Sequence, residues 1–208
     1  MADLEIARAA VDLPPARIVP QRPAPGHRAL TGGSGIVLFA CMFLPAVKGC
    51  HEAVMPFEVP PFLPPYGYGL VFALIAVSRT PRGLWLGVVA LRALGALMVV
   101  SSIVLALLAP PVAIVELIVG AVLLVTAGLT GATEPGIAAT GVAVGVVSVL
   151  WFGCWSATPD ALIGVYLSLA GSLGLLVGCA AWWREAVGRL RAAVPRAVPA
   201  AAHRQAPG

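Results

Sequence analysis

The longest apolar stretch of the chain, residues 83–130, predicts one hairpin of two helices. Its arms cover residues 83–109 and 112–130, and Pro110 and Pro111 separate them. A transmembrane helix needs about 20 predominantly apolar residues, so each arm is long enough to cross a bilayer. The apolar runs also lack the alternation of barrel strands, and a spanning backbone must satisfy its own hydrogen bonds. The pattern therefore predicts two transmembrane helices.

Further apolar segments flank this hairpin on both sides and predict spans over residues 35–47, 66–77, 136–155 and 161–183. The 66–77 segment is short for a full crossing, so a re-entrant segment is an alternative there. We expect an all-α integral membrane protein, a bundle of six transmembrane helices or of five with a re-entrant segment.

The polar, Pro-rich ends of the chain suggest a division into three regions. Residues 1–30 read as a disordered cytoplasmic tail, without the apolar core of a cleavable signal peptide. Residues 31–183 form the transmembrane domain, with a Pro-rich outer loop over 49–65. Residues 184–208 form a basic, partly disordered cytoplasmic tail that begins as an amphipathic helical turn.

The composition agrees with this division. Hydrophobic residues make up 60% of the 208-residue chain and charged residues only 11%. A soluble domain carries about 25% charged residues, so lipid must surround much of this chain. The net charge of +4 could suggest nucleic-acid binding, but no recognisable binding module or basic-aromatic stripe is present.

The positions of the arginines predict the orientation. An even number of spans places both termini on one side, and cytoplasmic loops carry an excess of positive charge. If both termini are cytoplasmic, Lys48 is the only lysine or arginine in the outer segments. With the same orientation, the inner segments hold the arginines Arg8, Arg17, Arg22, Arg28, Arg79, Arg82, Arg184, Arg189, Arg191, Arg196 and Arg204.

The Lys-poor, Ala- and Arg-rich composition favours a bacterial cytoplasmic (inner) membrane.

Each arm of the central hairpin carries one charged residue, Arg92 and Glu116. Helical rise puts Arg92 about 13 Å from its inner helix start and Glu116 about 6 Å from its outer one. In a core about 30 Å thick, this leaves about 10 Å between their levels. An unpaired central charge costs about 2.5–3.5 kcal/mol. An ion pair, snorkelling or protonation, and a solute or proton path all remain open, with Lys48 and His51 as alternative partners for Glu116.

The cysteines offer one candidate disulfide. Cys50 and Cys154 are both expected near the outer face, whereas Cys41 lies in the middle of the membrane and Cys179 in the inner half. An oxidising outer space would allow the Cys50–Cys154 bond if the two backbones approach within about 7 Å. Separate buried thiols are the alternative.

No metal or cofactor site is expected. The adjacent residues Cys50, His51 and Glu52 point in different directions, and a metal site needs three or four converging ligands.

Two small-residue ridges indicate close helix packing. Gly141 and Gly145 are four residues apart in the fifth predicted span, and Gly174 and Gly178 in the sixth. Such ridges let helix backbones approach closely. We expect the fifth and sixth spans to pack together, with homodimerisation as an alternative.

Catalytic constellations are not evident. No histidine shares the depth of the intramembrane serines, and no nucleophile elbow or phosphate-binding loop is present. We expect a non-enzymatic accessory or assembly component of the membrane. Its partners would be the bilayer and a second copy or another membrane protein. The alternative is a small-solute, ion or proton transporter or channel using Arg92 and Glu116.

Overall fold

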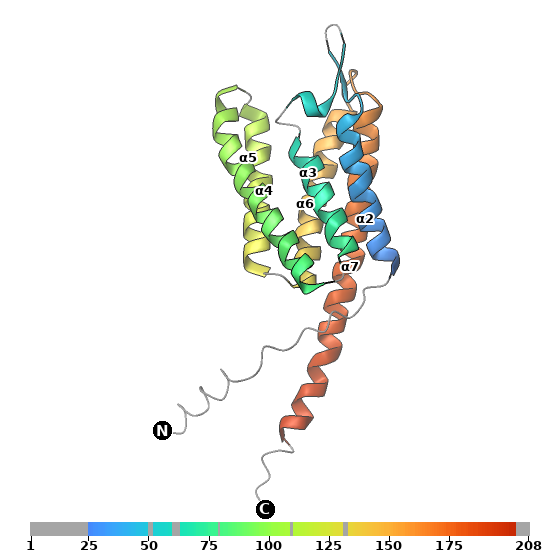
Figure 1. Cartoon of the computed structure of the whole chain (residues 1–208), viewed down its shortest axis with the longest axis vertical. Coiled ribbons are helices and arrows are strands. Elements are labelled where there is room, and N and C mark those ends of the chain that lie inside the picture. Colours follow the sequence, from blue (N-terminus) through green and yellow to red (C-terminus); the bar gives the residue numbers. More distant parts are fainter. Residues whose placement is uncertain are drawn as a thin grey trace, which may run out of the picture.

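The structure, a computed structural model, describes residues 25–49, 52–59, 63–78, 80–108, 110–130 and 133–202. Its six α-helices in this part of the chain run alternately up and down in one bundle (Figure 1). The predicted all-helical architecture is therefore confirmed for these residues. The helices are α2 (Pro25–Ala40), α3 (Leu63–Val77), α4 (Pro81–Leu108), α5 (Pro110–Thr130), α6 (Glu134–Ser156) and α7 (Ile163–Ala202).

Four of these helices, α4 to α7, are long and apolar enough to cross a membrane. They support the class of helical membrane protein. The exposed side chains agree with it, because water would penalise the large apolar groups on the outward faces of α4 and α5 whereas lipid does not. These groups include Leu97, Val100, Ile103, Leu107, Ile114 and Leu117, each at least 47% exposed.

The helices pack in a definite order of neighbours. Helix α2 contacts α3 and α7, α6 contacts α7, and α4 pairs with α5. The α4–α5 hairpin lies on one side of the bundle and reaches the other helices through α3 and α6 (Figure 1). Helix α7 is 40 residues long, and its last part continues beyond the bundle at one end (Figure 1).

Helix α2 differs from the expected first span because it begins at Pro25 rather than at Gly35, so the last residues of the expected disordered tail are helical. Proline is well suited to a first helical turn. Close packing against neighbouring helices, rather than an apolar sequence, stabilises these additional helical residues. Thr31 is fully buried against Gly178 of α7, and Gly35 lies against the backbone of Gly69 in α3.

A small cap with a pair of antiparallel strands follows α2. We name the end of the bundle at which this cap lies the hairpin end, after the strand pair and not after the α4–α5 hairpin. The cap contains the 3-10 helices η1 (Cys41–Phe43) and η2 (Pro56–Glu58) and the strands β1 (Val47–Lys48) and β2 (Ala53–Val54). The two strands pair antiparallel. The backbone nitrogen of Lys48 donates to the carbonyl of Asp160 at 2.9 Å, which ties the cap to the α6–α7 connection. The predicted Pro-rich loop is therefore partly ordered by backbone pairing.

Helix α3 is the short central helix. Pro64 and Pro65 fall in its first turn, where the backbone N–H groups have no intrahelical partner and proline is tolerated. Its 15 residues span about 22 Å, less than the apolar core of a bilayer. Tyr66, Tyr68 and Phe72 are buried on it. The first turn of α3, with Pro64 and Pro65, lines a space between α3 and its neighbours α4, α5 and α6.

We name the opposite end of the bundle the basic end. It carries the start of α2, the α3–α4 and α5–α6 connections and the projecting part of α7.

Candidate functional site

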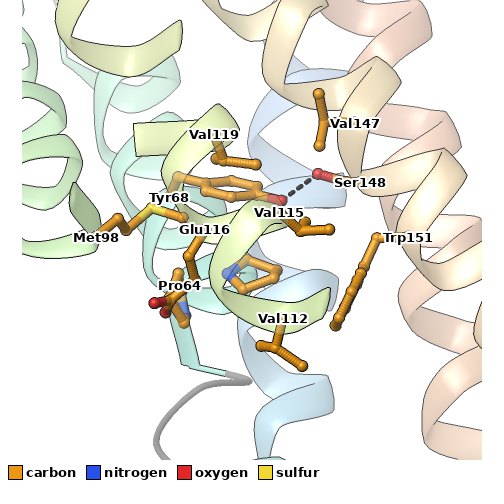
Figure 2. A pocket seen from close by; sticks show the side chains of 11 residues that line it. Pro64, Tyr68, Met98, Val112, Val115, Glu116, Val119, Val147, Ser148 and Trp151 are labelled. Carbon is orange, nitrogen blue, oxygen red and sulfur yellow. Dashed lines mark hydrogen bonds between the residues drawn. The ribbon is translucent and has the colours of Figure 1, made fainter. Parts of the chain in front are cut away.

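Glu116 lies on α5 near the hairpin end and is only 5% exposed. It lines a small pocket with a cavity volume of about 20 Å³, which is room for about one water molecule (Figure 2). Four helices, α3 to α6, contribute to the walls. The lining residues are Pro64, Pro65, Tyr68, Met98, Val112, Val115, Glu116, Val119, Val147, Ser148 and Trp151.

The carboxylate of Glu116 has one hydrogen-bond partner among the described residues. The hydroxyl of Ser101, on α4, lies 2.7 Å from its Oε2 atom. No cationic side chain in the described part of the chain forms a salt bridge with it. A carboxylate offers about four lone-pair sites. Glu116 therefore retains acceptor capacity toward the pocket, and no cationic side chain among the described residues forms an ion pair with it.

Tyr68 closes the pocket on the side toward the basic end. Figure 2 shows its ring crossing the pocket and its hydroxyl bonded to the hydroxyl of Ser148. Ser148 itself lies 2.7 Å from the carbonyl oxygen of Val144, to which it donates. Because Ser148 uses its hydrogen in that bond, Tyr68 is the donor in the hydroxyl pair. Both hydroxyls are satisfied within the protein, which leaves Glu116 as the open polar group of the pocket.

The remaining walls are apolar. They comprise valines from α5 and α6, the two prolines of α3, and the side chains of Met98 and Trp151. The site is therefore a small space with apolar walls, in which Glu116 is the open polar group.

A second cavity of about 30 Å³ lies under the cap, and Trp151 lines both cavities. Its walls come from η2, both strands and the aromatic residues Tyr66, Phe152 and Trp155. The side chains of Trp151 and Trp155 pack edge to face, with ring centroids 5.9 Å apart. The hairpin end thus holds two neighbouring apolar spaces, of which only the first faces a carboxylate.

Arg92 lies elsewhere, exposed on α4. Its guanidinium donates to the carbonyl of Ala127, 2.7 Å from Nη2 and 3.2 Å from Nε, and Nη2 lies 3.4 Å from the carbonyl of Gly128. The last four carbonyls of a helix have no intrahelical donor, so Arg92 caps the end of α5. Ala127 lies about 16 Å along the axis from Glu116. The structure does not bring Arg92 and Glu116 together.

The four predicted packing glycines all lie in contacts within the chain. Gly141 and Gly145 lie between α6 and α7, whereas Gly174 and Gly178 lie between α7 and α2. A Cβ at Gly178 would lie 2.9 Å from the backbone nitrogen of Thr31. The α7 ridge therefore contacts the first helix, and the glycines of α6 meet Leu176 and Cys179 of α7 instead.

The predicted Cys50–Cys154 disulfide stays a prediction because Cys50 lies outside the described residues. Cys154 is an exposed thiol near the end of α6, and Cys41 and Cys179 are buried. His51 is also outside the described part. Among the residues that the structure does describe, no group of three or more His, Cys, Asp or Glu side chains could hold a metal ion.

A cluster of charges at the basic end was not predicted from the sequence. Arg189 lies 3.1 Å from Glu134 and 3.8 Å from Glu185, and His27 lies 3.7 Å from Glu185. The guanidinium of Arg28 donates to the carbonyl of Ser78. The spacing of Glu185 and Arg189, four residues apart on one helix, was the one local signal for this cluster.

The fold and the site together define a helical membrane protein with a buried carboxylate in a pocket near one end of its bundle. Comparison with family models, curated proteins and solved structures finds no match for this chain. Its function must therefore be argued from the site.

Proposed function

We propose that this chain is a multi-pass protein of the bacterial cytoplasmic membrane, with six spans and its basic end in the cytoplasm. The distribution of cations supports this orientation, because positive charge is retained on the cytoplasmic side. Lys48 is the cation of the cap at the hairpin end. The basic end carries Arg28, Arg82, Arg184, Arg189 and Arg191.

Fusions to two reporters test the orientation. Green fluorescent protein at the C-terminus is expected to fluoresce, because it folds in the cytoplasm. Alkaline phosphatase fused after Asp160, at the hairpin end, is expected to be active, because it requires the oxidising side. The reversed pattern would overturn the proposed topology.

We further propose that the protein is a non-enzymatic transporter or channel for a small solute, ion or proton, with Glu116 on its path. The observation that carries this proposal is the buried carboxyl group, with a single hydroxyl partner among the described residues, in the wall of a pocket between α3, α4, α5 and α6. An ionisable group at membrane depth is costly, and such groups commonly mark solute or ion pathways. Arg92 has no part in this proposal because its guanidinium caps α5.

Cysteine accessibility tests whether the pocket opens to water. In a chain whose native cysteines are replaced by serine, Val112→Cys is expected to react with a membrane-impermeant methanethiosulfonate on intact cells. Ile114→Cys, on the outward face of α5 and 59% exposed in the absence of lipid, is the matched control and is expected to resist. Glu52→Cys in the cap serves as the positive control. An unreactive Val112→Cys beside a reactive Glu52→Cys would mean a dry pocket and would remove the solute proposal.

The second candidate is the non-enzymatic accessory or assembly component. The projection of α7 favours it, because a 40-residue helix is about 60 Å long and a bilayer core only about 30 Å thick. The surplus forms a helical surface at the basic end for a partner or a second copy. Purification in mild detergent should recover a stoichiometric partner with the full chain and lose it from a chain truncated after Ala192. Recovery of the full chain as a lone monomer would argue against this candidate.

A further inference from the structure

We propose that Glu116 is a proton-binding site, which holds one proton as a carboxylic acid and exchanges it with water at the hairpin end through a single water molecule in the pocket. The role of this site in transport rests on the proposed function, and the proton is then the species carried. The hydrogen bonds of Ser101, the charges around Glu116 and the size of the pocket support the inference.

The hydroxyl of Ser101 contacts two oxygen atoms. Its Oγ atom lies 2.7 Å from Oε2 of Glu116 and 3.0 Å from the carbonyl oxygen of Met98, which precedes it on α4. A hydroxyl group has one hydrogen to donate and two lone pairs with which to accept. Both contacts are full hydrogen bonds only if Glu116 supplies a second hydrogen, because its O–H then donates to Ser101 and Ser101 donates to Met98. An ionised Glu116 would leave one hydrogen for two acceptors.

No charged group stabilises an ionised Glu116 in the part of the chain that the structure describes. Its side chain is buried, and the salt bridges among the described residues lie at the basic end. The groups that α4 presents to it, Ser101 and Met98, are uncharged. The other titratable side chain of the pocket is Tyr68 of α3, whose hydroxyl is bonded to Ser148 of α6. A buried carboxyl group without a counter-ion is neutralised most cheaply by a proton.

The pocket has room for the one water molecule that the exchange requires. Its cavity volume is about 20 Å³, and one water needs about 10–15 Å³ with a few polar partners. Three of the side chains that line it, those of Glu116, Tyr68 and Ser148, carry oxygen atoms. Val112, in the first turn of α5 at the hairpin end, lines the same pocket, about 6 Å along the helix from Glu116. A single water therefore suffices to connect the carboxyl group with the hairpin end, and the space is too small for an organic solute.

Release of the proton is a single transfer from oxygen to oxygen. The O–H group of Glu116 turns from Ser101 to the pocket water and its O–H bond breaks, so the water becomes hydronium and the carboxylate keeps the electron pair. The hydroxyl of Ser101 then turns from the Met98 carbonyl and donates to the carboxylate. The Met98 carbonyl stays bonded, because within α4 it also accepts from the backbone N–H of Ser102. Uptake of a proton reverses these steps.

Infrared spectroscopy of the full chain in detergent tests the protonation of Glu116. A protonated carboxyl group absorbs at a higher C=O stretching frequency than a carboxylate does. At neutral pH the wild-type protein is expected to show a protonated-carboxyl band that is lost in Glu116→Gln and that shifts in deuterium oxide, because the proton exchanges. Glu58→Gln, which removes an exposed carboxylate from η2, is the matched control and should retain the band.

Two adjacent serines provide a second comparison. Ser101→Ala removes the acceptor of the Glu116 hydrogen, so the band should move to a higher frequency. Ser102→Ala is the matched control, because the Ser102 hydroxyl donates to the carbonyl of Val99 at 2.8 Å, and it should leave the band unchanged. This comparison carries the test if Glu116→Gln fails to purify as a monodisperse protein.

Proton flux into proteoliposomes separates the site from its role in transport. With a pH-sensitive dye inside and a potassium diffusion potential, the wild-type protein should admit protons, and Glu116→Gln should fall to the level of empty liposomes. An exchanging band without Glu116-dependent flux would overturn proton transport but not the proton site. A missing Glu116 band, a band that does not shift in deuterium oxide, or a band unmoved in Ser101→Ala would overturn the inference. The transport function would then depend on the reactivity of Val112→Cys alone.

Discussion

Arg92 of α4 caps the last turn of α5, with its Nη2 atom 2.7 Å from the carbonyl oxygen of Ala127. The carbonyl end of a helix carries partial negative charge and unpaired acceptors, so an arginine there satisfies both. The long side chain also carries the guanidinium from mid-helix toward the basic end. Arg92 therefore acts as a structural link within the α4–α5 hairpin.

Replacing Arg92 with glutamine should destabilise the protein. The lost contacts involve a charged donor, for which a cost of about 1.5–3 kcal/mol is typical, and the exposure of Arg92 places its value at the low end. The melting temperature in detergent should fall by about 4 °C. Arg92→Lys keeps the charge but not the paired donors, so an intermediate value is expected. Arg82→Gln, an exposed arginine in the first turn of the same helix, is the control. An Arg92→Gln protein as stable as the wild type would contradict the capping role.

Arg92 and Glu116 should behave independently. Their partners lie about 16 Å apart along α5, beyond the distance at which mutational effects couple. In a double-mutant cycle with Arg92→Gln and Glu116→Gln, the changes in the free energy of unfolding should add within about 0.5 kcal/mol. A coupling of about 1 kcal/mol or more would restore the candidate ion pair.

The Tyr68–Ser148 pair should respond asymmetrically to truncation. Tyr68→Phe removes the donor and leaves Ser148 bonded to the carbonyl of Val144. A loss of about 1 kcal/mol is expected. Ser148→Ala instead leaves the Tyr68 hydroxyl unpaired in an apolar site, which costs about 1–3 kcal/mol. Thermal unfolding of the two variants should therefore rank Ser148→Ala below Tyr68→Phe, and the reverse order would mean that the donor is Ser148.

The glycines of α6 allow a matched comparison with one substitution at two sites. A Cβ at Gly145 would lie 3.0 Å from the Cα of Leu176, whereas a Cβ at Gly153 would meet nothing within 4 Å. Overpacking costs about 1–3 kcal/mol. Gly145→Ala should lower the melting temperature by several degrees. Gly153→Ala should be neutral or stabilising by up to about 1 kcal/mol, because alanine is the better helix former. Equal effects would show that α6 and α7 are not in close contact at Gly145.

The long helices were predictable because hydrophobicity alone marks them. The arms at 83–109 and 112–130 correspond closely to α4 and α5. The start of α2 was missed because its first turns are polar and are held by glycine contacts with α3 and α7. The strands of the cap were not predicted, because a strand of two residues is too short to show an alternation of polar and apolar residues.

The candidate site was predictable only in part. Glu116 stood out because a charge interrupts an apolar run, but its surroundings depend on how four helices rotate against one another. Nothing local links Tyr68 to Ser148, which lie 80 residues apart. The same holds for Arg92, whose position in the sequence suggested a central charge although its guanidinium reaches the end of the neighbouring helix.

The charge cluster at the basic end should contribute little stability but a clear salt dependence. Arg189 lies 3.1 Å from Glu134, and their side chains are 25% and 15% exposed. Partly exposed ion pairs are worth about 0.2–1 kcal/mol and are screened by salt. Arg189→Gln should therefore lower the melting temperature by about 1–3 °C at low salt, and the difference from the wild type should shrink in 1 M NaCl, where the Debye length is about 3 Å. Arg191→Gln, an exposed neighbour on α7, should show neither effect. A difference that persists at high salt would instead assign Arg189 a packing role, carried by the apolar stem of its side chain between α6 and α7.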